Sequence, residues 1–364
     1  MDHVKILKRA LDISWRYKAL WVFGIILALT TGRNGGSGNS GSSVDRSSFG
    51  DGQGEFPRFF DQFSPPNITP EMVPGLIAAG LGLVCLVFIL TLVFIVARYV
   101  AETALIRMVD HYEETDQKVT IRQGFGWGWS RASWRLFLID LLIGLPLALI
   151  FIALFMLALS PLLLWATENT AAGVMGTVVT VGVFFLLITL AIVIAATLSL
   201  LQQFFRRVCV LDDQGVIESI KQGFALVKQN LKDVGIMWLI MIGVGIGWVI
   251  LLIPLMILLL ALGVIVGGVP ALLVAGLAGQ MVEGTLPWVI GGAVGIPILI
   301  MVMAIPLLFV GGLYEVFRSS VWTLTYREVT VLGQLEVEPV EAEPADTELD
   351  EVGLDEAEIS DLEG

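Results

Sequence analysis

Four ionisable residues lie beside long apolar segments, and they are the candidates for chemistry in this sequence: Arg98, Glu102, Asp140 and Glu315. A charge at the centre of a bilayer costs at least ~2.5 kcal/mol, so a residue of this kind is a candidate for proton or ion coupling. Each acid has a base nearby in the sequence, in the pairs Arg98–Glu102, Arg135–Asp140 and Glu315–Arg318. We therefore expect neutralised pairs near one membrane interface. Asp140 is the strongest candidate for a coupling role, ahead of Glu102 and Glu315.

The sequence contains few residues of the types that bind metals or act as nucleophiles. The chain contains two histidines, His3 and His111, and two cysteines, Cys85 and Cys209. We expect one cysteine inside a membrane segment and the other on the reducing side, which excludes a disulfide between them. No phosphate-binding loop is present, because the closely spaced glycines lack the preceding strand and the spacing of a nucleotide fingerprint. We expect no catalytic residues, no metal and no cofactor.

Long charge-free apolar segments carry or flank these residues. Asp, Glu, Lys and Arg are absent from residues 72–97, 141–167, 169–205, 234–282 and 284–314. Each segment is longer than the ~20 residues with which a helix crosses a bilayer core of about 30 Å. With 56% hydrophobic residues, the chain is predicted to be an all-α, polytopic membrane protein. A shorter apolar stretch adds a first span, and we expect about six spans, near 19–32, 73–97, 136–160, 174–205, 234–260 and 288–314.

The segment 234–282 is long enough to hold two spans, which would make seven in total. Seven spans would place the bases that follow the last span on the side that is otherwise poor in Lys and Arg. We therefore prefer one span near 234–260 and expect 261–282 to be half-buried or re-entrant, shielded by protein. A seventh span remains the alternative. Three G-x-x-x-G pairs, at 243/247, 263/267 and 291/295, are interpreted as packing sites within the monomer, with dimer faces as the alternative.

Lys and Arg fall almost entirely on one side of the expected spans. Of the 21 bases, only Arg33, Arg46 and Arg58 lie on the other side, in the loop 32–70. Because cytoplasmic loops carry the excess of Lys and Arg, we expect a multi-pass protein of the cell membrane with both termini in the cytoplasm. The Gly- and Ser-rich composition of 32–70 predicts a flexible outer loop.

The formal net charge of -13 resides in the C-terminal segment. Residues 336–364 contain 13 acids and no base, and the rest of the chain has as many bases as acids. Such a composition cannot bury enough apolar surface to offset the entropy of ordering. We expect a helical membrane domain over 1–335 and a disordered acidic cytoplasmic tail over 336–364.

Three segments align without gaps and predict an internal repeat: residues 7–27, 121–141 and 220–240. Their apolar residues recur at helical spacing, so each is expected to form an amphipathic helix that leads into a span. Such helices would lie along the inner headgroup layer, with the apolar stripe toward lipid and Lys and Arg toward water. The expected partners are membrane lipids of the anionic inner leaflet. A second copy or another membrane protein is left open as a partner, and no nucleic acid is expected.

Three short motifs resemble known membrane proteins. They are W-x-Y-K-x-L-W-x-F-G from Trp15 to Gly24, I-K-Q-G-F-x-L from Ile220 to Leu226, and S-x-x-W-T-L-x-Y-R from Ser319 to Arg327. Together they resemble a broad set of uncharacterised bacterial membrane proteins, similar to the membrane domain that accompanies some glycerophosphodiester phosphodiesterases. The resemblance covers roughly residues 4–330 and implies a helical membrane domain. In those enzymes a separate barrel of about 250 residues carries the catalysis, and this chain lacks the strand-helix alternation to build one. The resemblance therefore supplies no active-site residue.

These observations predict a non-enzymatic structural or accessory component of the cytoplasmic membrane. The alternative is a small-solute or lipid transporter, because duplicated units and broken helices occur in transporters. Prolines at 146, 254, 297 and 306 interrupt the expected spans, although proline is also ordinary in membrane helices.

Overall fold

The computed structural model describes residues 1–31, 73–166, 170–280 and 284–337. Within these ranges the elements are α1 (His3–Arg16), α2 (Ala19–Thr31), α3 (Val73–Thr115), α4 (Ile121–Gly128), α5 (Arg131–Leu159), the 3-10 helix η1 (Ser160–Ala166), α6 (Thr170–Leu211), α7 (Val216–Gln229), α8 (Leu231–Ala278) and α9 (Leu286–Val337). The described ranges contain no strand, which confirms the all-α prediction. The predicted outer loop 32–70 lies outside the described residues, as does the acidic tail beyond Val337, where α9 ends.

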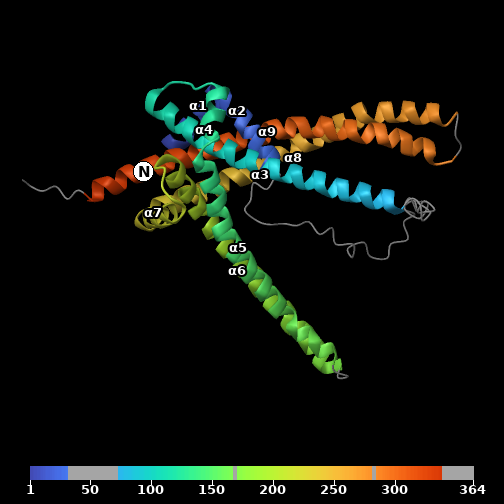
Figure 1. Ribbon diagram of the computed structural model, residues 1–364, viewed down its shortest axis with the longest axis horizontal. Helices are drawn as coiled ribbons and strands as arrows, with labels where there is room; N and C mark the ends of the chain where they lie inside the picture. Colours follow the sequence, from blue (N-terminus) through green and yellow to red (C-terminus); the bar gives the residue numbers. More distant parts are fainter. Residues whose placement is uncertain (32–72, 167–169, 281–283, 338–364) are drawn as a thin grey trace, which may run out of the picture.

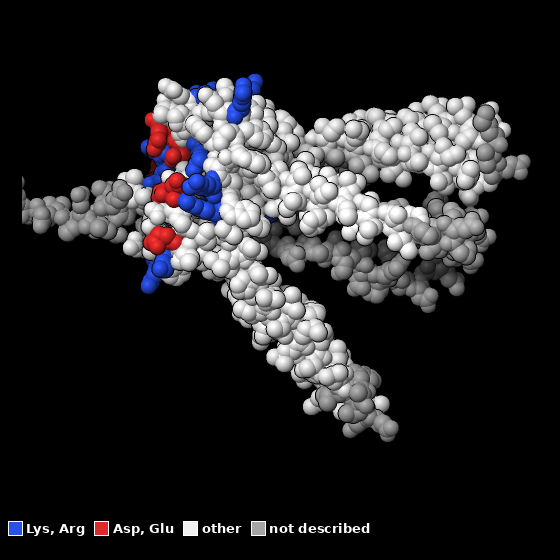
Figure 2. All heavy atoms as spheres, in the orientation of Figure 1, with Lys and Arg blue, Asp and Glu red and all other residues white. Residues whose placement is uncertain are grey.

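The molecule has a charged head and long apolar arms (Figure 1). We define the arms as residues 73–97, 141–205 and 234–314, and the head as α1, 98–140, 206–233 and 315–337. The arms formed by α3 and by the hairpin α8–α9 extend from one side of the head, and the hairpin α5–α6 diverges from them (Figure 1). Charged side chains gather on the head, whereas the arms show none on the face in view (Figure 2).

Five described helices are long and apolar enough to cross a membrane, and the bent pair α1–α2 makes a sixth when it is counted as one span. These helices identify a multi-pass membrane protein. Outgoing and returning helices alternate, so the chain comes back to the head after each hairpin (Figure 1). The N-terminus lies beside the C-terminal part of α9, where the Asp2 N–H donates to Glu328 Oε1 at 3.3 Å.

The structure differs from the prediction for residues 261–282. Helix α8 continues for 48 residues, through Pro254 and Pro270, as far as Ala278. Residues 261–278 are thus a continuous helix without the chain reversal of a re-entrant segment, and they are half-buried against α9, with Gly263, Gly267 and Ala275 buried. Small residues at the interface let two helix backbones approach closely.

Glycines bring the two helices of the α8–α9 hairpin together. A Cβ atom on Gly267 would lie 2.7 Å from the Gly295 oxygen, and a Cβ on Gly291 would lie 2.9 Å from Ala275 Cβ. The interpretation of these G-x-x-x-G pairs as packing sites within the monomer is confirmed. Gly243 and Gly247 differ, because a Cβ on either would meet nothing within 4 Å.

The packed core lies in the head and the adjoining ends of the apolar helices, where the returning helices α3, α6 and α9 meet. Leu105, Met108 and Phe204 are fully buried there, together with Phe23 from α2. A smaller cluster joins α3, α5 and α6 through residues such as Ile106, Leu136 and Phe205. The apolar side chains of the arms are mostly exposed, as expected for a surface that faces lipid.

Each short helix packs on a returning helix: α4 on α3, α7 on α6 and α1 on α9. Small residues make the contacts of α4 and α7. A Cβ on Gly128 of α4 would lie 3.0 Å from Val100 Cγ1 of α3, and a Cβ on Gly223 of α7 would lie 2.6 Å from Phe205 Cδ1 of α6. Because α1 packs on α9, the first and last helices of the chain are in contact.

A hydrogen-bonded tyrosine holds the bend between α1 and α2, whose axes differ by 99°. The Tyr17 hydroxyl donates to the Val119 carbonyl at 2.8 Å and accepts from the Val119 N–H at 2.6 Å. Burial raises the pKa of the Tyr17 phenol, so the hydroxyl keeps the proton that it donates. This contact joins the start of the chain to the segment between α3 and α4.

Candidate functional site

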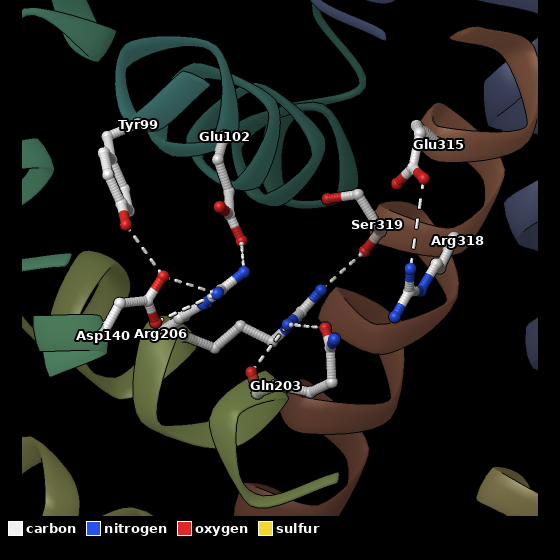
Figure 3. A network of polar contacts seen from close by, with 9 residues as sticks. Tyr99, Glu102, Asp140, Gln203, Arg206, Glu315, Arg318 and Ser319 are labelled. Atoms are coloured by element: carbon white, nitrogen blue, oxygen red, sulfur yellow. Dashed lines mark hydrogen bonds and ion pairs between the residues drawn. The ribbon is translucent and has the colours of Figure 1, made fainter. Parts of the chain in front are cut away.

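Two of the predicted carboxylates, Glu102 and Asp140, lie on either side of Arg206 (Figure 3). Arg206 Nη1 donates to Glu102 Oε1 at 2.6 Å, and Nη2 donates to Asp140 Oδ2 at 2.8 Å. The Tyr99 hydroxyl also donates to Asp140 Oδ2, at 3.0 Å. The side chains of Arg206 and Glu102 are each 11% exposed, and that of Asp140 is 17% exposed. We call Glu102, Arg206 and Asp140 the arginine triad; it joins α3, α5 and α6 at the base of the arms.

Apolar packing on three helices positions the arginine triad. On α3, Tyr99 and Ile106 are buried on either side of Glu102 in the smaller core cluster. On α5, Ile139 immediately precedes Asp140 and belongs to the same cluster, and on α6 so does Phe205, which immediately precedes Arg206. The charged residues therefore lie at the edge of a dry contact between helices, where charges must be paired.

The predicted local pairs are correct in only one case. Glu315 and Arg318 are 4.0 Å apart, as expected from their spacing. Arg135 instead pairs with Asp213 at 3.2 Å. Five residues turn a helix through about 500°, which leaves Arg135 and Asp140 about 140° apart on α5.

Arg98 likewise does not pair with Glu102. Its guanidinium lies over the Tyr99 ring, 5.7 Å from the ring centroid, and it forms no ion pair with another described residue. A base that precedes an acid by four residues is the less favourable order on a helix. The tertiary contact with Arg206 takes its place.

Sequence reasoning missed Arg206 and its neighbour Arg207. A signal was present, because the head part of each returning helix contains an arginine in a similar setting: Ile106-Arg107-Met108-Val109, Phe205-Arg206-Arg207-Val208 and Tyr326-Arg327-Glu328-Val329. In all three segments the residue before the first arginine and the valine are buried. Arg107 donates to the Trp127 carbonyl at 3.3 Å, and Arg327 donates to Asp110. The three arginines thus each reach a neighbouring element.

Arg207 has no carboxylate partner among the described residues. Its side chain is buried, and it donates to the Gln203 carbonyl at 2.6 Å and to the Ser319 carbonyl at 3.2 Å. The Nε atom is buried without a hydrogen-bond partner. Figure 3 shows Glu315 and Arg318 on α9, beside Ser319.

The other candidate residues are dispersed over the structure. Cys85 is exposed on the α3 arm, and Cys209 is buried in the head. His3 lies 4.0 Å from Asp233, and the His111 ring packs edge-on against Trp127. Within the described ranges, no group of three or more His, Cys, Asp or Glu is placed to hold a metal ion.

One cavity lies along the α5–α6 arm. It is lined by aromatic and aliphatic side chains, among them Phe151, Phe155 and Phe184. No charged or polar side chain contributes to its lining. The cavity offers an apolar surface and no group for acid-base chemistry, so the arginine triad and its neighbours are the candidate site.

Comparisons with known proteins assign no activity to this chain. No curated protein and no solved structure matches this chain. One family model matches residues 10–338, which is most of the chain and covers the head, the arms and the arginine triad. The protein therefore belongs to a family of unknown function, DUF7544.

Proposed function

We propose that this protein is a non-enzymatic structural or accessory component of the cytoplasmic membrane, with its head on the cytoplasmic side. One observation carries the proposal: a single charged head receives every returning helix, while the arms expose apolar surface. The basic residues concentrated in the head favour the cytoplasmic side. Both termini of the described chain lie there, since Asp2 contacts Glu328.

The three short helices support an association of the head with the inner leaflet. At aligned positions, Leu11, Phe125 and Phe224 are 62%, 41% and 53% exposed. The protein-facing side of each helix is made by smaller residues one position earlier, Ala10, Gly124 and Gly223. Each helix thus has a side for the protein, a large apolar side and a charged side. The apolar side and the charged side are both exposed. A helix that lies in a membrane interface has the same two exposed sides.

The structure differs from the expectation that the whole apolar stripe of the first helix faces lipid. On α1, part of the apolar stripe, including Ile6 and Ile13, is buried in the core of the protein. The apolar residues left for lipid are Val4, Leu11 and Trp15. Because α1 packs on α9 through apolar side chains, one part of its apolar stripe contacts the protein and only the other part is left for the membrane.

The same positions support an internal repeat of three units. Each unit consists of a short helix, an outgoing helix and a long returning helix: α1-α2-α3, α4-α5-α6 and α7-α8-α9. In each unit the aligned base, Lys8, Arg122 or Lys221, is exposed. Equivalent residues therefore have equivalent environments, which is what duplication of one unit would produce.

Reporter fusions test the orientation. We expect cytoplasmic signals from fusions after residues 115, 213 and 335, and external signals from fusions after 50, 168 and 280. A reporter active only outside the membrane and one active only inside should give complementary results at each position. Cytoplasmic signals at 50, 168 or 280 would overturn the proposed topology.

Cysteine accessibility tests the position of the short helices. In a background without Cys85 and Cys209, Phe224→Cys should react slowly with a water-soluble thiol reagent and Gln222→Cys should react rapidly. Both positions are exposed in the protein itself, so a difference in rate reports the membrane. Phe125→Cys and Gln123→Cys form the matched pair on α4. Equal rates in intact membranes would show that these helices stand away from the bilayer.

The alternative function, transport of a small solute or a lipid, is supported by the position of the arginine triad. Buried charges at the junction of α3, α5 and α6 are of the kind that mark ion or proton pathways. Comparing lipid and metabolite pools in a deletion strain with those of the wild type separates the two functions. A changed pool that Asp140→Asn also produces, at normal protein level, would favour transport.

A further inference from the structure

Four guanidinium groups and three carboxylates follow or precede the boundaries between the arms and the head along the chain: Arg98, Arg206, Arg207 and Arg318 with Glu102, Asp140 and Glu315. They are the first charged residues that follow the apolar segments of α3, α6 and α9 or precede that of α5. Positive charge is in excess by one within this group. If the arms cross a bilayer, these boundaries are adjacent to the lipid phosphates.

The excess positive charge is not spread evenly over the group. Arg206 takes up two of the carboxylates, Glu102 at 2.6 Å and Asp140 at 2.8 Å. Only Glu315 remains for the other bases, and its ion pair with Arg318 is long, at 4.0 Å. Among the described residues, Arg98 and Arg207 thus have no ion pair with a carboxylate, and Arg318 has only this long one.

Arg207 provides a second, independent observation. It is only 2% exposed, and its Nε is buried without a hydrogen-bond partner. Glu102 acts on it with opposite charge, and Arg206 and Arg318 act on it with like charge. Glu102 is already hydrogen-bonded to Arg206, at 2.6 Å. A buried guanidinium among like charges is expensive unless an anion offsets it.

Access to this region comes from Arg98 and Arg318, which are only partly buried. The Arg318 side chain is 27% exposed, and Arg98 is also partly exposed. Arg98, whose guanidinium lies over the Tyr99 ring, acts electrostatically on both Glu102 and Glu315. Arginine guanidiniums bind phosphate oxygens with paired, charge-assisted hydrogen bonds.

We propose that Arg98, Arg207 and Arg318 form a binding site for the phosphate of an anionic phospholipid, at the level where α3, α6 and α9 enter the head. The proposal rests on the proposed function for the position of the membrane. Free inorganic phosphate presents the same oxygen atoms, but the site lies next to apolar arms that provide a surface for acyl chains. A phospholipid satisfies both the charge and the apolar neighbourhood.

The experiment measures lipid binding to the purified full chain in detergent by native mass spectrometry. The probes are phosphatidylglycerol, phosphatidylcholine with the same acyl chains, and inorganic phosphate. We expect Arg98→Gln and Arg318→Gln each to weaken phosphatidylglycerol binding by about tenfold, because a charge-assisted hydrogen bond is worth roughly that factor. The matched control is Arg131→Gln, an exposed base at the start of α5, nine residues before Asp140, which should leave binding unchanged.

Each outcome of the titrations decides the proposal. Unchanged affinity in both Arg98→Gln and Arg318→Gln would overturn it, as would equal binding of phosphatidylcholine. Competition by inorganic phosphate that removes the lipid would assign the site to free phosphate instead. If a glutamine variant fails to fold, Arg318→Lys keeps the charge but loses the planar donor pair, and it should still weaken binding. Reporter fusions with the expected topology and no lipid binding would overturn this inference while leaving the proposed function intact.

Discussion

Replacing Arg206 by methionine is expected to destabilise the protein by about 3–5 kcal/mol, because it removes one partner of a buried ion pair and leaves the other charge uncompensated. Arg206 serves two carboxylates at once, Glu102 and Asp140. Methionine retains much of the side-chain length, so the loss reports unpaired charge rather than an empty volume. The measurement is the free energy of unfolding by denaturant in detergent micelles.

Two further variants separate charge from other causes. Arg135→Met breaks the pair with Asp213, whose side chain is 72% exposed, and an exposed pair is worth less than about 1 kcal/mol. The triple variant Arg206→Met, Glu102→Gln, Asp140→Asn should recover part of the stability, since no carboxylate is left unpaired. If Arg206→Met costs no more than Arg135→Met, the arginine triad does not form.

A second large effect is expected for Gly24→Leu, where α2 crosses α9. A Cβ on Gly24 would overlap the Gly312 carbonyl, and a Cβ on Gly312 would lie 2.8 Å from the Ile25 nitrogen. Backbone atoms cannot move aside as a flexible side chain can, so we expect a loss of about 1–3 kcal/mol or more. The thermal unfolding midpoint should fall, and proteolysis near the N-terminus should become faster as α2 separates from α9.

Gly80→Leu is the matched control for this substitution. Gly80 also lies in an apolar helix, but a Cβ there would meet nothing within 4 Å. A leucine on this lipid-facing part of α3 should change stability by less than about 0.5 kcal/mol. Similar losses in both variants would contradict close packing of α2 on α9, because the effect would then come from the loss of glycine itself.

Length and apolar composition made the long helices predictable. A segment without charges that enters a bilayer must satisfy its backbone polar groups internally, and a helix does this from local residues alone. A short helix was also expected before each of three spans, and α1, α4 and α7 lie there; the breaks that separate them from α2, α5 and α8 were not predicted. For residues 261–278 the same reasoning failed. Gly and Pro suggested an irregular segment, but contact with α9 through Gly267 and Gly295 keeps α8 helical there.

The partners of the charged residues were less predictable than the helices. Arg98 and Arg135 were the expected ion-pair partners of Glu102 and Asp140, because they are nearby in the sequence. Neither forms the expected pair. The signal for Arg206 lay in the similar sequence around Arg107 and Arg327 on the other two returning helices.

The sequence by itself determined the helical membrane architecture, the alternation of the spans and the end of the molecule at which charge collects. These properties follow from composition and from contacts within one turn of a helix. Only the tertiary structure decided that Arg206 serves a carboxylate 104 positions away, and that Gly124 and Gly223 rather than their larger neighbours face the core. The physical reason is that such contacts depend on how separate helices cross. That geometry is set by the sum of many packing contacts, which the local spacing of residues does not encode.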